Sequence, residues 1–216
     1  MSEENSVPKL PGTISLDLIP ANMYGKAVKK VVISLSLLTL GAIAIVWWAV
    51  NWWVALIVGA LISGPTILSA LSALRRSLTL EGSTIRAIRG VFSKRVDLSK
   101  ADSVEFVVRP GKISMINLYV HDGKSAVTVP LAVYSKGAGR ELDIVAVRGL
   151  ADGLANGGTA ASLAASTVLI NQLRSMARDA PPLQRPLYKA TMDAIAAGSI
   201  SVTLTDEQVA KLVEMG

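Results

Sequence analysis

A run of 44 residues without a single charged side chain, residues 31–74, limits what this chain can fold into more than any other feature. As one helix the run would be about 66 Å long at ~1.5 Å per residue, whereas the hydrocarbon core of a bilayer is ~30 Å thick. The sequence therefore predicts a transmembrane hairpin of two helices, over residues 31–50 and 52–74. A re-entrant arrangement is the alternative to two full spans.

All four tryptophans of the chain lie near the middle of this run, two on either side of Asn51. They are Trp47, Trp48, Trp52 and Trp53. An indole ring is amphipathic and is best accommodated where a membrane meets water. We therefore expect these residues to anchor the hairpin turn at the outer interface, in preference to forming a cofactor or ligand site.

Basic residues flank the run on both sides. Lys26, Lys29 and Lys30 precede it, and Arg75 and Arg76 follow it. By the positive-inside rule both termini face the cytoplasm, in the plasma membrane. Residues 1–30 are then a cytoplasmic N-terminal arm, ordered or flexible. Its acidic start, Glu3-Glu4, is not that of a signal peptide, so we expect the first span to be retained.

Small residues mark a packing face in the second span. Gly59, Ser63 and Gly64 lie about one turn apart, which lets another helix approach closely. That helix is either the first span, where Gly41 offers a matching face, or a helix of a larger membrane complex. Pro65 is expected to kink the second span locally.

The composition indicates a membrane protein with a water-exposed portion. Of the 216 residues 51% are hydrophobic and 18% are charged, which is too polar for membrane alone and too apolar for one ordinary soluble domain. The 142 residues beyond position 74 suffice for one small domain with an appendage. The absence of cysteine excludes disulfides, thiolate metal sites and cysteine nucleophiles.

From Ser77 onward the apolar period changes from helical to alternating, with frequent turn signals. Short strands are predicted over residues 78–80, 84–88, 91–98, 104–108, 113–120 and 124–133. Asp122-Gly123 favours a hairpin turn whose central residues both have positive φ. A helical stripe over residues 142–154 then follows. The predicted class is α+β.

Three segments carry a resemblance to a known family: residues 78–86, residues 90–98 and the valine-rich residues 104–108. Following two spans and an arginine pair, they resemble bacterial pleckstrin-homology-like (PH-like) membrane proteins over roughly residues 75–154. The resemblance implies that residues 75–156 form a cytoplasmic PH-like β-meander or barrel in two curved sheets, capped by a C-terminal helix. The alanine-rich, basic composition is compatible with an actinobacterial source.

Basic residues accumulate at the start of this domain. The candidates for facing lipid or a partner are Arg75, Arg76, Arg86, Arg89, Lys94 and Arg95. Residues 75–156 hold 13 Lys or Arg and 8 Asp or Glu, a net of +5. Beside an anionic leaflet each basic residue contributes ~1 kcal/mol, although a merely solvated basic face is an equal alternative. Their spacing does not fit inositol-phosphate recognition, and no stacking or groove-reading motif indicates nucleic acid.

Residues 157–216 are predicted to be a helical tail, with helices over residues 159–178, 183–197 and 205–214. Thr205 and Gln208 have capping-box spacing. The tail has 5 basic and 5 acidic residues and few core residues, so disorder until binding is one possibility. Packing on the meander is another, and binding to a partner is slightly favoured.

No catalytic, cofactor or metal site is expected. The single histidine, His121, lies at a hairpin turn, and one histidine without cysteine cannot assemble the usual zinc sites. Neither a nucleotide-binding glycine motif nor a nucleophile elbow occurs. Neither span contains an ionisable residue, which disfavours a transporter.

The sequence thus favours a non-enzymatic accessory, scaffolding or assembly subunit of a larger membrane complex. Its expected partners are membrane lipids and other integral membrane subunits. By resemblance only, a respiratory-supercomplex associated factor is one concrete candidate. The alternative is a self-standing PH-like module that binds anionic lipid at the cytoplasmic face.

Overall fold

The computed structural model describes residues 13–18, 33–34, 77–89, 92–135, 138–198 and 201–214. Of the two predicted spans only Ile33 and Ser34, both helical, fall within these ranges. Trp47, Trp48, Trp52, Trp53, Gly59, Ser63 and Gly64 all lie outside the described residues. Among the helices of the described segments, none combines the length and the apolar character needed to cross a bilayer. The transmembrane hairpin therefore stays a prediction.

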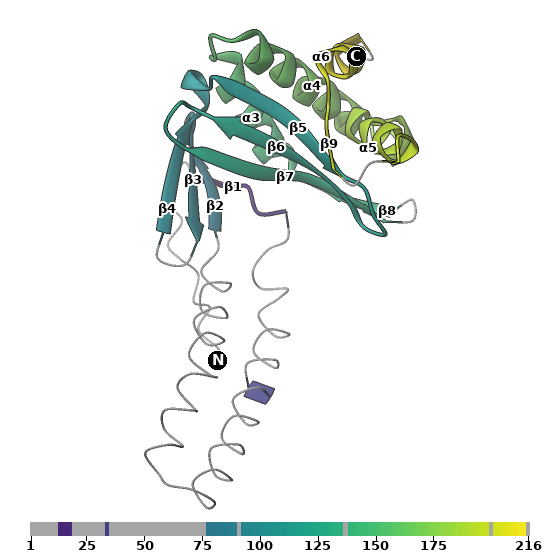
Figure 1. The fold of residues 1–216 in the computed structure, drawn as a ribbon, viewed down its shortest axis with the longest axis horizontal. Helices are drawn as coiled ribbons and strands as arrows, with labels where there is room; N and C mark the ends of the chain where they lie inside the picture. Colours follow the sequence, from purple (N-terminus) through teal and green to yellow (C-terminus); the bar gives the residue numbers. More distant parts are fainter. Residues whose placement is uncertain are drawn as a thin grey trace, which may run out of the picture. The chain divides into compact units, whose positions relative to one another are not determined.

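The described chain is α+β, as predicted, with its strands in two antiparallel sheets (Figure 1). The four-stranded sheet has the order β1 (Thr13–Ser15), β2 (Ser77–Glu81), β3 (Thr84–Arg89) and β4 (Phe92–Asp97). The five-stranded sheet has the order β8 (Ala138–Glu141), β7 (Ala126–Ser135), β6 (Ser114–His121), β5 (Ser103–Arg109) and β9 (Val202–Thr203). The helices are the 3₁₀ turn η1 (Leu98–Lys100), α3 (Ile144–Ala155), α4 (Ala160–Ala177), the 3₁₀ turn η2 (Pro182–Gln184), α5 (Pro186–Ala196) and α6 (Asp206–Glu214).

The chain divides into two compact units. The first consists of residues 1–18, 77–87 and 94–216, and the second of residues 19–76 and 88–93. The first unit therefore contains the whole five-stranded sheet and all of the helices α3 to α6. The contacts that follow are within the first unit.

The six predicted strands are confirmed, but three further strands escaped the sequence pattern. β1 pairs with β2 through Ile14 opposite Leu80, β8 pairs with the end of β7, and β9 pairs with β5 through Val202 opposite Val108. Strands of two to four residues carry too little alternation to be recognised. The two antiparallel sheets agree with the expected pair of sheets, but within the described residues they do not close into a barrel. The predicted domain bounds are also too narrow, because β1 and β9 join the two sheets from segments outside residues 75–156.

The Asp122-Gly123 turn joins β6 to β7 as predicted, but by different chemistry. Among the described residues of this turn only Gly123 has a positive φ, of 79°. The Asp122 carboxylate accepts hydrogen bonds from the backbone N–H groups of Lys124 and Ser125, at 3.1 and 2.8 Å. A four-residue loop closed by an aspartate side chain replaces the expected two-residue turn.

Helix α3 approaches the four-stranded sheet closely because glycines face it. A Cβ at Gly149 would lie 2.7 Å from Cδ2 of Leu80, and one at Gly153 would lie 2.5 Å from Cδ1 of Leu98. Leu80 of β2 and Leu98 of η1 are both buried, as are Ile85 and Val96 on the inner face of the sheet. The inner face of the four-stranded sheet is therefore core.

The tail is helical and packs on the sheets. Helices α4 and α5 gather at the β5 side of the five-stranded sheet, with α6 beyond them (Figure 1). Residues 157–216 thus pack on the five-stranded sheet, and a partner-binding role for them stays a prediction. The helix predicted over 183–197 begins only at Pro186, because Pro186 fits the first helical position and Pro182–Gln184 forms a separate turn.

Buried polar side chains of α4 hold the tail together. Ser166 Oγ donates to the Ala151 carbonyl of α3 at 2.9 Å, and Asn171 Nδ2 donates to the carbonyls of Leu212 and Val213 in α6 at 3.3 and 2.9 Å. Gln172 Oε1 accepts from the N–H of Leu187 at 3.3 Å. The low apolar content of the tail is thus compensated by hydrogen bonds from one helix to its three neighbours.

Candidate functional site

The outer face of the four-stranded sheet places two of the predicted basic residues opposite each other. The Leu98 N–H donates to the Ser83 carbonyl at 2.8 Å, which sets the antiparallel register of β3 and β4. Counting back along both strands, this register puts Ile85 opposite Val96 and Arg86 opposite Arg95. Since successive side chains of a strand alternate between faces, the two arginines point away from the core.

Neither guanidinium has an acidic partner within the described part of the chain. Arg86 is half-buried, and its Nε is buried without a hydrogen-bond acceptor. Arg95 is exposed, like its neighbour Lys94. Like charges directly opposite each other destabilise a sheet, and an unpaired buried donor adds to that cost. We name this pair, Arg86 with Arg95, the arginine pair.

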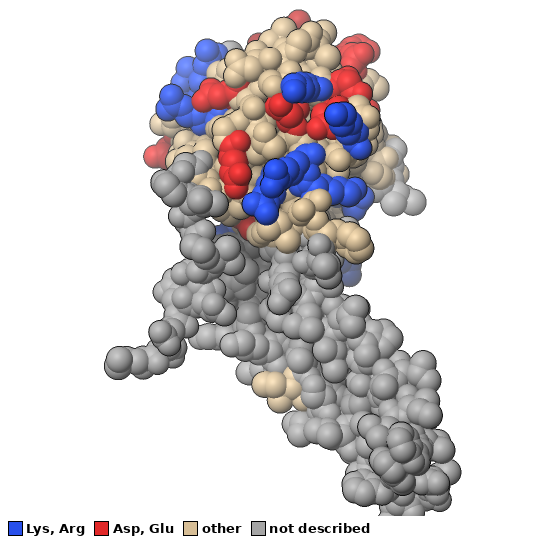
Figure 2. All heavy atoms as spheres, turned by 90° about the vertical axis from the view of Figure 1, so that its left-hand side faces the viewer, with Lys and Arg blue, Asp and Glu red and all other residues tan. Residues whose placement is uncertain are grey.

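The carboxylates nearest in register are engaged elsewhere or lie further along the strands. Asp97 Oδ1 accepts from Ser99 N at 3.1 Å, from Ser99 Oγ at 2.7 Å and from Ser83 Oγ at 3.1 Å. Glu81 is exposed at the far end of β2. Figure 2, which looks onto the side where β4 lies, shows basic side chains interspersed with acidic ones. The arginine pair is therefore a local feature and not part of a uniformly basic face.

The remaining predicted residues are only partly described. Arg75 and Arg76 lie outside the described residues, and Arg89 is described only as the last residue of β3, without its side chain. The basic candidates therefore reduce, within the described part, to Arg86, Lys94 and Arg95. The register of the strands brings Arg86 and Arg95 together. Lys94, one position before Arg95 in β4, belongs to the other face of that strand.

A buried polar cluster that the sequence did not indicate joins the five-stranded sheet to the tail. Arg185 Nη1 donates to Glu141 Oε2, and Tyr134 OH donates to Glu141 Oε1 at 2.7 Å. The Tyr134 ring meets Tyr188 edge-on, with centroids 5.0 Å apart. Burial, and then the neighbouring Glu141 carboxylate, raise the pKa of the Tyr134 phenol far above its usual range. Tyr134 therefore remains a hydrogen-bond donor at any ordinary pH.

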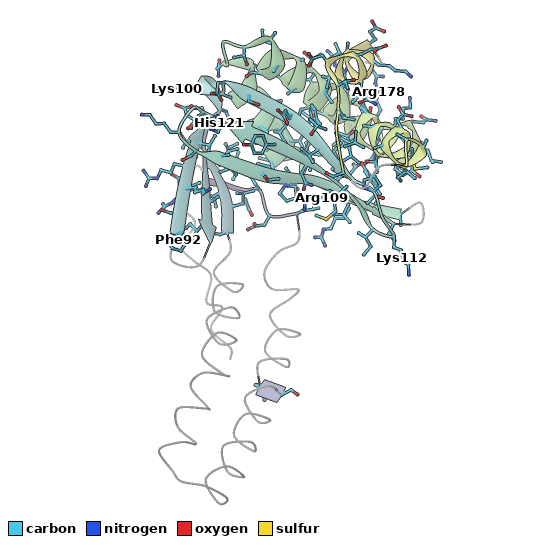
Figure 3. All side chains as sticks on the ribbon, in the orientation of Figure 1. Phe92, Lys100, Arg109, Lys112, His121 and Arg178 are labelled. Carbon is cyan, nitrogen blue, oxygen red and sulfur yellow. The ribbon has the colours of Figure 1, made fainter. Side chains whose placement is uncertain are left out.

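His121 is part of a polar network at the hairpin turn, where Figure 3 labels it beside Lys100 of η1. Its Nδ1 lies 2.8 Å from Asp102 Oδ1 and 3.1 Å from the backbone N of Gly123. This nitrogen donates to Asp102 when it carries the ring proton and accepts from the Gly123 N–H when it does not. Asp122 Oδ2 accepts from the Asp97 N–H at 3.2 Å and so links β4 to this turn. These contacts close the turn. Across the described residues no group of three or more potential metal ligands assembles.

The carboxyl groups of this network are stabilised in their ionised form. The Ser99 hydroxyl lowers the pKa of Asp97, and the hydrogen bond to His121 lowers the pKa of Asp102. For Asp122 partial burial opposes ionisation, but the N–H groups of Ser125, Asp97 and Lys124 together lower its pKa. Each of these shifts has its cause in the hydrogen bonds of the turn network.

A shallow hollow of about 220 Å³ lies between α5 and the β9–α6 segment. It is lined by Ala190, Asp193, Leu204, Gln208, Lys211 and Leu212. Its polar lining is of mixed charge, and the described side chains around it present no nucleophile with a paired base.

Comparison with known proteins adds no relative: no family model, no curated protein and no solved structure matches the chain.

Proposed function

We propose that this chain is a non-enzymatic accessory subunit, anchored in the plasma membrane by a two-helix hairpin, that scaffolds or assists the assembly of a larger membrane complex. The observation that carries the proposal is the charge-free run of residues 31–74 with basic residues on both sides. This run ends three residues before β2 begins at Ser77. The predicted anchor and the folded domain are therefore nearly contiguous in sequence.

The described domain supports a role in binding rather than in transport of a substrate. The five-stranded sheet and the helical tail belong to one compact unit, so a partner would meet a formed surface. In the bilayer, Gly59 and Ser63 offer a small-residue face to another helix. A PH-like cytoplasmic domain on such an anchor fits a factor associated with a bacterial respiratory supercomplex, and this is our concrete candidate.

The proposal is tested by solubilising native membranes in mild detergent, sizing the protein and identifying the proteins that migrate with it. We expect a defined set of integral membrane proteins at a mass well above that of the chain. The variant Gly59→Leu/Ser63→Leu should release the chain from this set, because bulky side chains prevent close helix approach.

Ser72→Leu is the matched control, since at helical spacing it falls on the opposite face of the second span from Gly59. It should leave the assembly intact. A wild-type chain that migrates alone contradicts the accessory-subunit proposal. A Gly59→Leu/Ser63→Leu variant that stays in the assembly contradicts the assignment of this small-residue face to a helix of the partner.

One observation favours a second function, the self-standing module that binds anionic lipid. It is the arginine pair, which lacks acidic partners in the described chain. A chain that migrates alone in detergent but depends on anionic lipid for a property of residues 84–97 would favour this second function over the first.

A further inference from the structure

The arginine pair is an incomplete arrangement that an anion would complete. Arg86 and Arg95 are opposite in the register that the bond from Leu98 N to Ser83 O sets, so their Cβ atoms are ~4.5–5.5 Å apart. Two positively charged side chains at directly opposite positions of a strand pair repel each other. One anion accepting from both would remove the repulsion and would also give the buried Nε of Arg86 the acceptor that it lacks.

The chemistry of the guanidinium selects the class of anion. Its planar fork of N–H donors matches the oxygens of a phosphate or a carboxylate. No carboxylate of the described chain fills this position: Asp97 is bound to Ser83 and Ser99, and no ion pair joins Glu81 to either arginine. The ligand must therefore come from outside the described chain.

Chain length limits where this ligand can be. Thr79 follows Leu74, the last residue of the predicted second span, by five residues, which reach at most ~18 Å when fully extended. Thr79 Oγ1 donates to the backbone carbonyl of Arg86 at 3.5 Å, so nearly the same upper limit on the distance from the end of the span applies to Arg86. If the hairpin lies in the membrane, the arginine pair is held near a layer rich in phosphate groups, whose negative potential attracts basic residues.

We propose that Arg86 and Arg95 together bind the phosphate group of an anionic phospholipid head group at the membrane surface. This inference rests on the membrane anchor of the proposed function, but not on the accessory role. Head-group binding would fix the orientation of the four-stranded sheet against the leaflet. It would also stabilise the pairing of β3 with β4, because the anion removes the repulsion between the two arginines.

The test uses the full chain in lipid nanodiscs, once with phosphatidylcholine alone and once with phosphatidylglycerol added. The readout is amide hydrogen exchange over residues 84–97. We expect severalfold slower exchange in the discs that contain phosphatidylglycerol. The variant Arg86→Gln/Arg95→Gln should lose this difference between the two kinds of disc.

The matched control is Arg109→Gln/Lys112→Gln, which removes two exposed charges near the turn between β5 and β6 (Figure 3). It should keep the full protection. Equal exchange of the wild type in both discs overturns the proposal, as does retained protection in Arg86→Gln/Arg95→Gln. Equal loss in the control also overturns it, because the effect would then be one of net charge.

A third arm separates the two sources of phosphate. Inorganic phosphate added to discs of phosphatidylcholine alone should give no protection at the concentration of the lipid head group. Full protection by inorganic phosphate overturns the head-group assignment. The arginine variant should still migrate with the partner set in mild detergent, so failure of this inference and failure of the accessory proposal are distinguishable.

Discussion

Arg185, the residue before α5, donates a hydrogen bond from Nη1 to Oε2 of Glu141, the last residue of β8, 44 positions earlier in the chain. Only 19% of the arginine side chain and 8% of the glutamate side chain are exposed. Arg185 Nε also donates to the Ala180 carbonyl at 2.9 Å. A buried ion pair thus joins the helical tail to the five-stranded sheet.

Loss of one partner of this pair should destabilise the protein strongly. Arg185→Ala leaves the Glu141 carboxylate buried without its counter-charge, and breaking such a pair costs ~3–5 kcal/mol. Urea unfolding of the full chain in detergent, followed by circular dichroism, measures this change. Arg178→Ala, an exposed arginine at the end of α4, should change the free energy of unfolding by less than ~0.5 kcal/mol. Similar values for the two variants would show that the pair adds nothing to stability.

Replacement of Gly139 by alanine should destabilise the protein, because the ring of Tyr134 on the neighbouring strand β7 covers the Cα of Gly139. The two residues are direct partners of β8 and β7, and a Cβ at Gly139 would overlap the Tyr134 ring and lie 3.3 Å from the Val133 carbonyl. The ring cannot move freely, since it is fixed by Glu141 and Tyr188. We expect Gly139→Ala to cost ~1–3 kcal/mol of unfolding free energy.

The control for this substitution is Gly158→Ala. A Cβ at Gly158 would meet no atom within 4 Å, and its φ is not in the left-handed region. Gly158→Ala should therefore be neutral or stabilise by up to ~1 kcal/mol through the unfolded state. An unchanged stability of Gly139→Ala would mean that the Tyr134 ring is not held as described.

Local patterns in the sequence identified the elements but not the contacts between distant segments. The capping box at Thr205 is confirmed in both directions: Thr205 N donates to Gln208 Oε1 at 3.0 Å, and Gln208 N donates to Thr205 Oγ1 at 3.3 Å. These groups are three residues apart, so their spacing alone predicts the bonds. The bond between Arg185 and Glu141 spans 44 residues and has no local signal.

The tail shows the same limit in another form. Few apolar residues indicated weak packing, yet Asn171 and Gln172 are buried and bond to α6 and α5. The residue types Asn and Gln are equally suited to a helix face in water and to a buried face that bonds to the backbone of a neighbouring helix. The sequence alone therefore does not distinguish the two cases. Proximity in sequence indicated six basic residues together, and only the register of β3 and β4 singles out Arg86 and Arg95 among them.

The free energy of unfolding should fall in acid because the turn network contains carboxylates that are stabilised in their ionised form. The folded-state pKa values of Asp97, Asp102 and Asp122 are lowered, so their stabilisation is present above the unfolded pKa of 3.8 and is lost as the pH falls through the folded values. Burial raises the pKa of Asp17, and its protonation opposes this trend weakly. The free energy of unfolding, measured by urea titration at successive pH values, should drop below pH 3.8.

Asp97→Asn identifies the source of this acid dependence. It should lower stability at neutral pH, where Ser83 and Ser99 lose a charged acceptor, and should reduce the slope of stability against pH below the unfolded pKa. A slope identical to that of the wild type would assign the acid dependence to other groups.

Helix α6 should open more readily than the rest of the tail. Only Leu212 of α6 is buried, a hollow lies beside it, and Asn171 supplies the bonds to its last carbonyls. Thr205→Ala removes the cap at the other end, which costs ~1 kcal/mol. Amide exchange of residues 206–214 should accelerate about fivefold in Thr205→Ala, as ~1 kcal/mol implies, while α4 remains protected. Equal acceleration in α4 would mean that the tail opens as one unit.

The predicted topology is open to a direct chemical test because the chain has no cysteine of its own. Cysteines introduced as Glu3→Cys and Ala210→Cys lie on opposite sides of the charge-free run, and the positive-inside rule places both in the cytoplasm. A membrane-impermeant maleimide should therefore label neither in intact cells and both after lysis. Asn51→Cys, in the predicted outer turn, should be labelled in intact cells and serves as the positive control. Labelling of position 3 or 210 from outside would contradict the orientation, and since the head-group proposal requires the arginine pair to face the anionic inner leaflet, it would contradict that proposal as well.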